Sequence, residues 1–353
     1  MDLNETRRQI DRIDFEIVKL LNMRMELALR ARKLKPSVQD PAREMDVLSA
    51  ARKHSQSVVR PEFSEKLFAG IIDESRQLQA QDLTLVGFQG EHGANSELAV
   101  RSLDPSWVPI PCVEFVDVFE CVRKGQLDGG VVPVENSIEG GVTQVNDLLV
   151  EVDVRITGEI RVPIHHCLLA LPDSDYRDIK VVYSHPQALA QCREFLARNK
   201  LEPRPFYDTA GSAMMLSRER PKAAAVIANR LCAELYDLEI LKENIEDHES
   251  NSTRFVVLRG GEGVEQDGNK CSIIFRTAHR SGALFSVLKI FSDAGINLTR
   301  IESRPIRQDP GNYAFLLDFQ GSSSDVRVRR ALEAARGETA WFKFLGCYTE
   351  AAS

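Results

Sequence analysis

The stretch Val131-Val-Pro-Val-Glu-Asn-Ser-Ile-Glu-Gly-Gly141 decides how the middle of this chain is predicted to fold. An apolar run typical of a buried strand ends abruptly in the polar residues Glu135, Asn136 and Ser137. Open α/β sheets bind ligands where their strands end, so these polar side chains are candidates for a binding site. An ordinary strand-to-helix turn, capped by Asn136 or Ser137, is the alternative interpretation.

Short apolar strands and helical patterns alternate on both sides of this stretch. Strands are expected at 83–88, 130–134, 155–171 (with a break), 180–184, 223–228 and 253–258. Helices are expected at 95–102, 115–124, 188–198 and 212–219. Such alternation predicts an α/β domain over residues 83–260, and the Gly-rich stretch after it, 260–270, is predicted to be a linker.

Residues 1–80, by contrast, contain only helical patterns. Apolar residues at spacings of three and four, from Ile10 onward, form the seam of one long helix, which Pro36 is expected to end. Asp40-Pro41 suits the start of a second helix, and a third is expected over 62–79. Helices this few enclose only a thin core, so we expect this all-α domain to dimerise and bury its seam.

The last part of the chain, residues 268–353, follows the order strand, helix, strand, strand, helix, strand. That order predicts an α+β domain of the ferredoxin-like kind. The run Asp309-Pro310-Gly311-Asn312 is expected to form the turn between the two middle strands. A chain of 353 residues is long enough for the three domains predicted in this way.

Composition restricts the partners and the compartment that we expect. A formal net charge of −7 argues against nucleic acid or an anionic membrane as the main partner. No run of about 18 apolar residues appears, and the charged N-terminus does not resemble a secretory signal, so a cytoplasmic protein is expected. The seven cysteines are scattered without a Cys-x-x-Cys pair, and adjacent His165 and His166 would point to opposite faces of a strand. Neither a metal site nor another cofactor is therefore predicted.

Two cations interrupt the apolar pattern of the first helix. Arg24 lies where a core residue is expected, and Lys35 follows eleven residues later on nearly the same face. A buried cation without a partner is costly, so each must meet an anion. One interpretation is a cavity for a small polyanion inside the helical bundle. The other is a salt bridge to a nearby acidic residue: Asp40, Glu44 or Asp46.

Residues 1–80 resemble the all-helical chorismate mutase family. The resemblance is carried by Ile10-Asp-Arg-Ile-Asp14, Arg24-Met-Glu-Leu-Ala28, Lys35, Asp40-Pro-Ala-Arg-Glu44 and Ile72-Asp-Glu-Ser-Arg-Gln-Leu-Gln79. It implies an intertwined dimer whose active site is lined by Arg24, Lys35, Asp40, Arg43, Glu44, Ser75 and Gln79. Arg7 of the partner subunit would complete each site.

The same resemblance implies a reaction that needs charge placement rather than a proton donor. Chorismate rearranges to prephenate in one concerted step, so the enzyme must hold an unfavourable conformer and stabilise charge on the ether oxygen. The arginines would hold carboxylates, because a guanidinium can bind both oxygens at once, with Ser75 assisting. Lys35 and Gln79 would donate to the ether oxygen, and Asp40 and Glu44 would bind the ring hydroxyl.

Polar loops lie at the strand ends of the α/β region: Phe88–Ser96, Val131–Gly141, Tyr183–Gln187 and Asn251–Leu258. Taken singly, each has an ordinary interpretation. The Gly-rich first loop is either a plain turn or a backbone-amide site for an anion, and Thr253 alone would be a common strand residue. In this order, however, the loops resemble prephenate dehydratase over roughly residues 83–260, with Thr-Arg-Phe at 253–255 among the most telling motifs.

That resemblance implies two α/β lobes with the active site in the cleft between them. Prephenate would lose its ring hydroxyl and carbon dioxide together, with Thr253 as the proton donor to the departing hydroxyl. His185 is a second candidate for the acid, although a structural role is the simpler interpretation. Other residues would orient the substrate: Glu135, Asn136, Ser184 and Gln187.

Residues 271–348 resemble the ACT domain, a small ligand-sensing module. The resemblance rests on Arg280-Ser-Gly-Ala-Leu284, at a helix start, and Leu298-Thr-Arg-Ile-Glu-Ser-Arg-Pro305, at a strand end. A structural cap and an edge strand are the alternative interpretation. In dehydratases such loops imply a phenylalanine site between two ACT domains, where amides at a helix start suit a carboxylate. The residues concerned are Gly282, Ala283, Leu284, Glu302, Ser303, Arg304 and Pro305.

Together these resemblances imply a bifunctional enzyme of phenylalanine synthesis that uses no cofactor. It would act on chorismate and then on prephenate, be inhibited by L-phenylalanine, and form a homodimer or a larger homo-oligomer. One alternative is a dehydratase for arogenate, which carries an amino group where prephenate carries a keto group. The other is a phenylalanine-responsive binding protein that catalyses no reaction.

Overall fold

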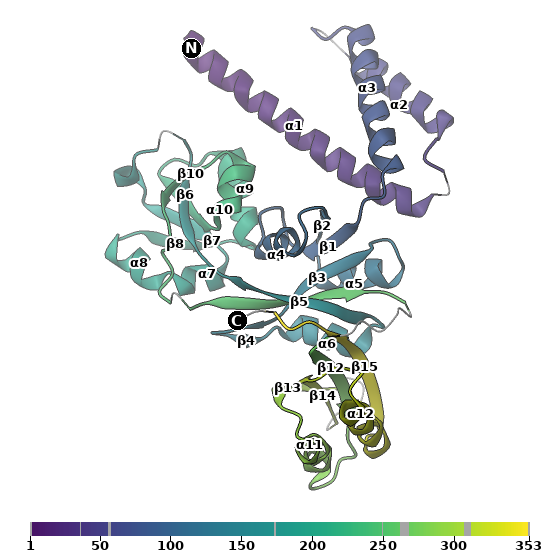
Figure 1. Ribbon diagram of the computed structural model, residues 1–353. Helices are drawn as coiled ribbons and strands as arrows, with labels where there is room; N and C mark the ends of the chain where they lie inside the picture. Colours follow the sequence, from purple (N-terminus) through teal and green to yellow (C-terminus); the bar gives the residue numbers. More distant parts are fainter. Residues whose placement is uncertain are drawn as a thin grey trace. The chain divides into compact units, whose positions relative to one another are not determined.

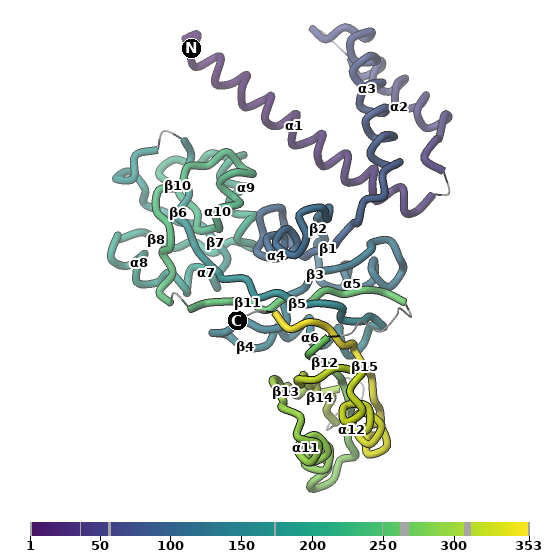
Figure 2. The backbone as a smooth tube through the Cα atoms, viewed as in Figure 1, coloured from purple at the N-terminus to yellow at the C-terminus, as the bar shows by residue number. Residues whose placement is uncertain are grey.

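The computed structural model describes residues 2–35, 37–55, 58–172, 174–248, 250–261, 268–306 and 312–351. The chain forms two compact units, Met1–Leu85 and Val86–Ser353 (Figures 1 and 2). Pro36, most of the predicted linker and most of the predicted turn at 309–312 lie outside the described residues. An all-α unit is followed by α/β and α+β parts, which confirms the predicted fold class.

The first unit consists of helices α1 (Leu3–Leu34), α2 (Pro41–His54) and α3 (Pro61–Ala80). Asp40 caps α2 as the sequence predicts, because its carboxylate accepts the backbone amide of Arg43 at 3.1 Å. Proline occupies the first position of both α2 and α3, where a missing amide costs nothing.

The apolar seam of α1 is left uncovered within one chain. Ile10, Ile13, Leu20 and Leu27 are 51%, 60%, 60% and 62% exposed. Leu29 is the one buried side chain of this helix, every residue of which the structure describes. A long exposed stripe of this kind is typical of a helix that packs against another chain.

The second unit begins with a six-stranded sheet in the order β2-β1-β3-β11-β5, with β4 paired to β3. Its strands are β1 (Leu85–Gln89), β2 (Val108–Cys112), β3 (Gly129–Asn136), β4 (Gly140–Gly141), β5 (Arg155–Pro163) and β11 (Ser252–Arg259). Its helices are α4 (Asn95–Leu103), α5 (Phe115–Arg123) and α6 (Thr143–Glu151). Because β11 lies between β3 and β5, the chain leaves this lobe after β5 and returns to the middle of the sheet.

A second lobe, inserted between β5 and β11, contains a five-stranded sheet in the order β10-β6-β9-β7-β8. Its strands are β6 (Cys167–Ala170), β7 (Val181–Ser184), β8 (Glu202–Pro205), β9 (Ala224–Ala228) and β10 (Glu239–Lys242). Its helices are α7 (Pro186–Gln191), α8 (Arg193–Arg198), α9 (Thr209–Glu219) and α10 (Arg230–Tyr236). Separate apolar clusters cover the two faces of the sheet, one beneath α9 and α10 and the other beneath α7 and α8.

The C-terminal sheet has the order β13-β14-β12-β15, as a ferredoxin-like fold requires. Its elements are β12 (Lys270–Arg276), α11 (Ala283–Asp293), β13 (Leu298–Pro305), β14 (Tyr313–Gln320), α12 (Val326–Glu338) and β15 (Trp341–Tyr348). Helices α11 and α12 pack on one face around Phe291 and Phe319 (Figure 1). Strand β15 also packs against β5 of the first lobe.

The sequence missed some elements for identifiable reasons. Strands β2 and β8 lie at sheet edges and each contains two prolines, which hides a strand pattern but is tolerated where no neighbour needs the amide. The helix expected at 188–198 is two short helices that meet at Cys192. Helices α6 and α10 were also not expected. In the described part of the chain, no helix is long and apolar enough to cross a membrane.

Candidate active sites

A cavity of about 400 Å³ lies between the two α/β lobes. From the first lobe it is lined by Gln89, Asn95, Ser96, Asn136, Thr253 and Phe255. From the second it is lined by His166, His185, Gln187, Gln191, Tyr207, Asp208, Thr209 and Asn229. Strand ends from both sheets therefore converge on one polar cavity, as open α/β sheets favour.

Asn136 and Thr253 face each other in the cavity wall. They are paired positions of the β3–β11 ladder, and Asn136 Nδ2 donates to Thr253 Oγ1 at 2.9 Å. The Asn136 Oδ1 atom accepts the backbone amides of Ile138 and Glu139 at 3.0 and 3.1 Å, which fixes the orientation of the side-chain amide. Since an amide nitrogen can only donate, Thr253 Oγ1 must accept, and its own proton stays available for a bound molecule.

The other residues predicted for this cleft are divided by the structure. Gln187 lines the cavity, and so does His185, whose ring accepts the Gln187 amide at the start of α7. Ser184 is fully buried and donates instead to the Ile227 carbonyl at 2.7 Å, so it ties β7 to β9. Glu135 does not line the cavity, because it precedes Asn136 on the strand and neighbouring residues point to opposite faces.

The Gly-rich loop is held by a buried carboxylate rather than left open for an anion. Glu97 accepts the Gly93 amide at 2.7 Å and also binds Arg101 and His92. Burial opposes the charge of Glu97, but its bonds to His92, Gly93 and Arg101 hold its pKa below the ordinary value. The Gly93 amide is thus already occupied, which favours the structural interpretation of this loop.

In the described part of the helical unit, Arg24 of α1 and Lys35 just after it form no ion pair with Asp40, Glu44 or Asp46. Arg24 Nη1 donates to Ser75 Oγ at 2.6 Å, and Lys35 Nζ donates to the Val38 carbonyl at 3.1 Å. Burial, and then Arg43, lower the pKa of Arg24. Gln79 is only 9% exposed, and its Oε1 atom has no hydrogen-bond partner among the described residues. Such an orphaned buried oxygen is costly in a finished protein core and is typical of a site that awaits a ligand.

Arg43 lies near enough to Arg24 to lower its pKa, whereas Asp40, Glu44 and Arg7 have other places in this unit. Asp40 caps α2, and Glu44 lies 3.6 Å from Arg76. Arg7 lies near the start of α1, seventeen residues before Arg24, and does not contact the Arg24–Ser75 pair. The predicted role of Arg7 therefore requires a second chain and stays a prediction.

The C-terminal sheet has a cavity of about 320 Å³ beside the start of α11. Gly282, Ala283 and Leu284 line it, together with Tyr313 and Phe315 of β14. In the described part of the chain, the four predicted residues of β13 are not among the residues that line this cavity. Two of these side chains turn toward the first lobe: Glu302 accepts from Asn146, and Arg304 donates to Asp147. Ser303 is exposed, and Pro305 is exposed at the end of the strand.

Three family models match successive parts of the chain. The family models that match are chorismate mutase type II over residues 6–80, prephenate dehydratase over 86–262 and the ACT domain over 272–337. A bifunctional chorismate mutase/prephenate dehydratase of Aquifex aeolicus is 36% identical over 99% of this chain and 98% of its own length. The chain belongs to this family. The three family resemblances that the sequence indicated are thereby confirmed.

Two further relatives each match about three quarters of the chain. Arogenate dehydratase 1 of Petunia hybrida is 39% identical, over 74% of this chain and 66% of its own length. A crystal structure of prephenate dehydratase from Arthrobacter aurescens, in complex with L-Phe, is 33% identical with a TM-score of 0.70. It covers 76% of this chain and 90% of its own.

The sequence prediction missed several residues that line the cavity between the lobes. Asn229 donates from Nδ2 to the Gly93 carbonyl at 2.7 Å and to Asn95 Oδ1 at 2.9 Å, so it links the two lobes beneath the cavity. It follows strand β9 directly, and the same strand-end rule could have found it. Asp208 caps α9 through the Gly211 amide, and burial raises its pKa. The sequence did not indicate Asp208 as a helix cap, because the predicted helix began three residues after the true start of α9.

Proposed function

We propose that this chain catalyses two consecutive reactions, from chorismate to prephenate and from prephenate to phenylpyruvate, and that L-phenylalanine inhibits the second. The observation that carries the proposal is the Asn136–Thr253 pair. The Thr253 hydroxyl accepts from Asn136, donates to no acceptor among the described residues, and borders the cavity between the lobes. A dehydratase needs such a donor at the leaving hydroxyl.

The dehydration would proceed with little covalent help from the protein. As the ring C–O bond breaks, the hydroxyl takes the proton of Thr253 Oγ1 and leaves as water. The bond to the ring carboxylate breaks at the same time, carbon dioxide departs, and that electron pair makes the ring aromatic. Water returns a proton to Thr253. Because threonine is a weak acid, the Asn136 hydrogen bond serves to place and stabilise the Thr253 oxygen.

For the helical unit we propose the site lined by Arg24, Lys35, Asp40, Arg43, Glu44, Ser75 and Gln79, with Arg7 from a second chain. The Arg24–Ser75 pair and the unpaired Gln79 oxygen support it. The uncovered seam of α1 supports an intertwined dimer, since burying it removes a long apolar stripe from water.

Prephenate is the favoured substrate of the cleft, because the first unit would produce it in the same chain. The arogenate dehydratase relative matches only 74% of the chain, whereas the bifunctional relative matches 99%. A cytoplasmic location is proposed on the seven cysteines, all free in the structure, since reduced thiols are typical of that compartment.

The test is to mix purified protein with chorismate alone and to follow chorismate loss and phenylpyruvate formation separately. We expect both, and we expect phenylalanine to slow only the second. If chorismate persists while added prephenate is converted, the helical unit is only a dimerisation domain. If neither reacts but arogenate does, the alternative substrate is correct. If none reacts, the binding-protein alternative takes first place.

A further inference from the structure

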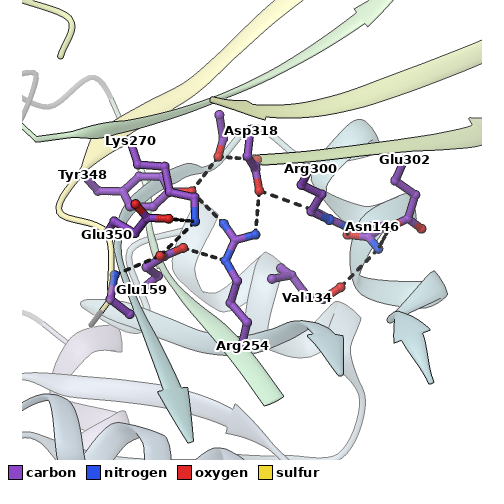
Figure 3. Close-up of polar contacts among 12 residues, drawn as sticks. Val134, Asn146, Glu159, Arg254, Lys270, Arg300, Glu302, Asp318, Tyr348 and Glu350 are labelled. Carbon is purple, nitrogen blue, oxygen red and sulfur yellow. Dashed lines mark hydrogen bonds and ion pairs between the residues drawn. The ribbon is translucent and has the colours of Figure 1, made fainter. Parts of the chain in front are cut away.

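The proposed chemistry does not use a buried ionic cluster that joins the first lobe to the ACT sheet (Figure 3). The cluster consists of Glu159, Arg254, Lys270, Asp318 and Tyr348, each at most 7% exposed. It joins β5 and β11 of the first lobe to β12, β14 and β15 of the ACT sheet. Taking ionised groups out of water is costly unless each is paired and hydrogen-bonded, so the members of such a cluster depend on one another.

Arg254 is the centre of this cluster and the direct neighbour of Thr253. Thr253 and Phe255 line the cavity, so the intervening Arg254 points to the opposite face of β11. Its Nε donates to Glu159 Oε2 at 2.6 Å, within the lobe. Nη1 donates to Asp318 Oδ2 at 2.6 Å and Nη2 to the Tyr348 hydroxyl at 2.9 Å, both in the ACT sheet. Two of the three bonded nitrogens thus bind groups of the regulatory domain.

The charges of this cluster stabilise one another. Burial opposes ionisation of Arg254, but Asp318, Tyr348 and Glu159 hold its pKa above the ordinary value. Burial likewise opposes the charge of Asp318, yet Arg254 and Arg300 hold its pKa low. Ser272 donates to Asp318 Oδ1 at 2.6 Å and completes its hydrogen bonds. A network that is satisfied in this way has a well-defined geometry, and a displacement of one member displaces the others.

A second connection runs from β13 to the strand that carries Asn136. Arg300 of β13 binds Glu302, Asn146 of α6 and, at 3.9 Å, Asp318. Asn146 Nδ2 in turn donates to Glu302 Oε2 at 3.0 Å and to the carbonyl of Val134 at 3.4 Å, two residues before Asn136 (Figure 3). The strand with the predicted phenylalanine residues is therefore linked to both halves of the catalytic pair.

Gly141 shows how closely β13 of the ACT sheet approaches β4 of the first lobe. A Cβ atom at this position would lie 2.2 Å from Glu302 Oε2. The second glycine of the Val131–Gly141 motif thus leaves room for the approach of an ACT side chain to β4, which pairs with Glu135 and Asn136 of β3 through Gly141 and Gly140.

We propose that Arg254 is a positioning residue that transmits movements of the ACT sheet to the Thr253 hydroxyl. The proposal rests on the proposed function, because it assigns Thr253 as the proton donor. When an effector binds, β13 and β14 shift and carry Arg300 and Asp318 with them. The hydrogen bond between Asp318 and Arg254 then moves the Arg254 side chain, and this turns Thr253 away from its place beside Asn136. Inhibition then appears in kcat for prephenate and little in KM, because the donor and not the binding surface is displaced.

The test compares Asp318→Asn with Lys343→Met. The amide in the first variant would keep an oxygen for Arg254 but lose the charge. Lys343 is a half-buried cation of the same junction, bonded to the Leu149 and Val152 carbonyls, and no described contact joins it to the cluster. We expect Asp318→Asn to reduce the phenylalanine effect on kcat at least about fivefold, the lower end of typical coupling, with KM nearly unchanged. Lys343→Met should keep the wild-type ratio of kcat without phenylalanine to kcat with it. Mutase activity should be unaffected in both variants.

Hydrogen exchange of residues 252–259 gives a second readout that does not need turnover. Phenylalanine should alter exchange there in the wild type and in Lys343→Met, but not in Asp318→Asn. Unchanged inhibition and exchange in Asp318→Asn would overturn the proposal, and so would equal losses in both variants. If the wild type does not convert prephenate, the proposed function fails, while exchange still tests the connection. Should Asp318→Asn not fold, Tyr348→Phe removes one hydrogen bond to Arg254 and must reduce the coupling in the same direction.

Discussion

The Thr253 hydroxyl is a weak acid, so its contribution depends on where it is held. Asn136 donates to its oxygen on one side, and the peptide bonds on either side of Thr253 belong to a strand between two neighbours. On the reverse face of that strand, Arg254 is bonded to three groups. The proposed proton donor and the proposed link to the ACT sheet are thus two consecutive residues of the chain.

We predict that Thr253→Ala lowers dehydratase kcat by about 10²–10⁴-fold, the usual contribution of a placed proton donor, and leaves the mutase reaction intact. Thr253→Ser is the matched variant, since it keeps the hydroxyl and the hydrogen bond from Asn136. Steady-state rates with prephenate and with chorismate measure both activities. An Ala variant as fast as the wild type would remove Thr253 from the mechanism.

His166 makes stability depend on pH. The side chain is 3% exposed, and burial lowers its pKa below 6.5, so the folded protein holds the ring neutral. In the unfolded chain the His166 ring takes up a proton as the pH falls below 6.5. Protonation favours the unfolded state, so the contribution of His166 to the free energy of unfolding is present above that pH and is lost below it. We predict that His166→Gln flattens the fall of the unfolding midpoint between about pH 7 and 5.5. An unchanged slope in thermal unfolding would contradict this.

At the scale of single elements, α1 carries more apolar surface than the other helices of one chain cover. Its apolar seam is exposed along most of its length, although every turn of the helix forms. A helix of this kind gains most of its stability from packing and little from its intrinsic propensity.

We predict that Ile13→Asp combined with Ile17→Asp weakens association through α1. Mutase activity per mole should fall at least about tenfold at low protein concentration and recover as concentration rises, because mass action restores the dimer. Dehydratase activity should not change. Val58→Asp, which places the same charge at a residue that is 92% exposed in the first unit, is the control. Specific mutase activity that is independent of concentration in the double variant would argue against a shared seam.

At the scale of the whole molecule, a symmetric dimer would place Arg24 and Arg7 of one site on different chains. Each of Arg24→Ala and Arg7→Ala should then abolish mutase activity alone. When the two variants are co-expressed, each mixed dimer contains one intact site of its two, so mixed dimers should regain about half of the wild-type activity. Recovery is measured on mixed dimers purified through two different tags. No recovery, with both chains present in the dimer, would place Arg7 outside the site.

By itself, the sequence determined the fold class, the order of the three parts and the strand-end loops, because hydrophobic periodicity and turn residues are local signals. The resemblance of these loops to prephenate dehydratase then singled out Asn136, Thr253 and Gln187, and the structure brings all three to one cavity, the first two from one lobe and Gln187 from the other. Ser184 looked equivalent in sequence, but the structure buries it against a carbonyl.

Only the tertiary structure decided which side of β11 each residue serves. Sequence shows that Thr253 and Arg254 must point to opposite faces, but it cannot say what covers the second face. The answer depends on β14 and β15, far along the chain, whose Asp318 and Tyr348 reach Arg254. Contacts between residues so far apart leave no periodic pattern in the chain, so the ionic cluster appears only once the sheets have packed together.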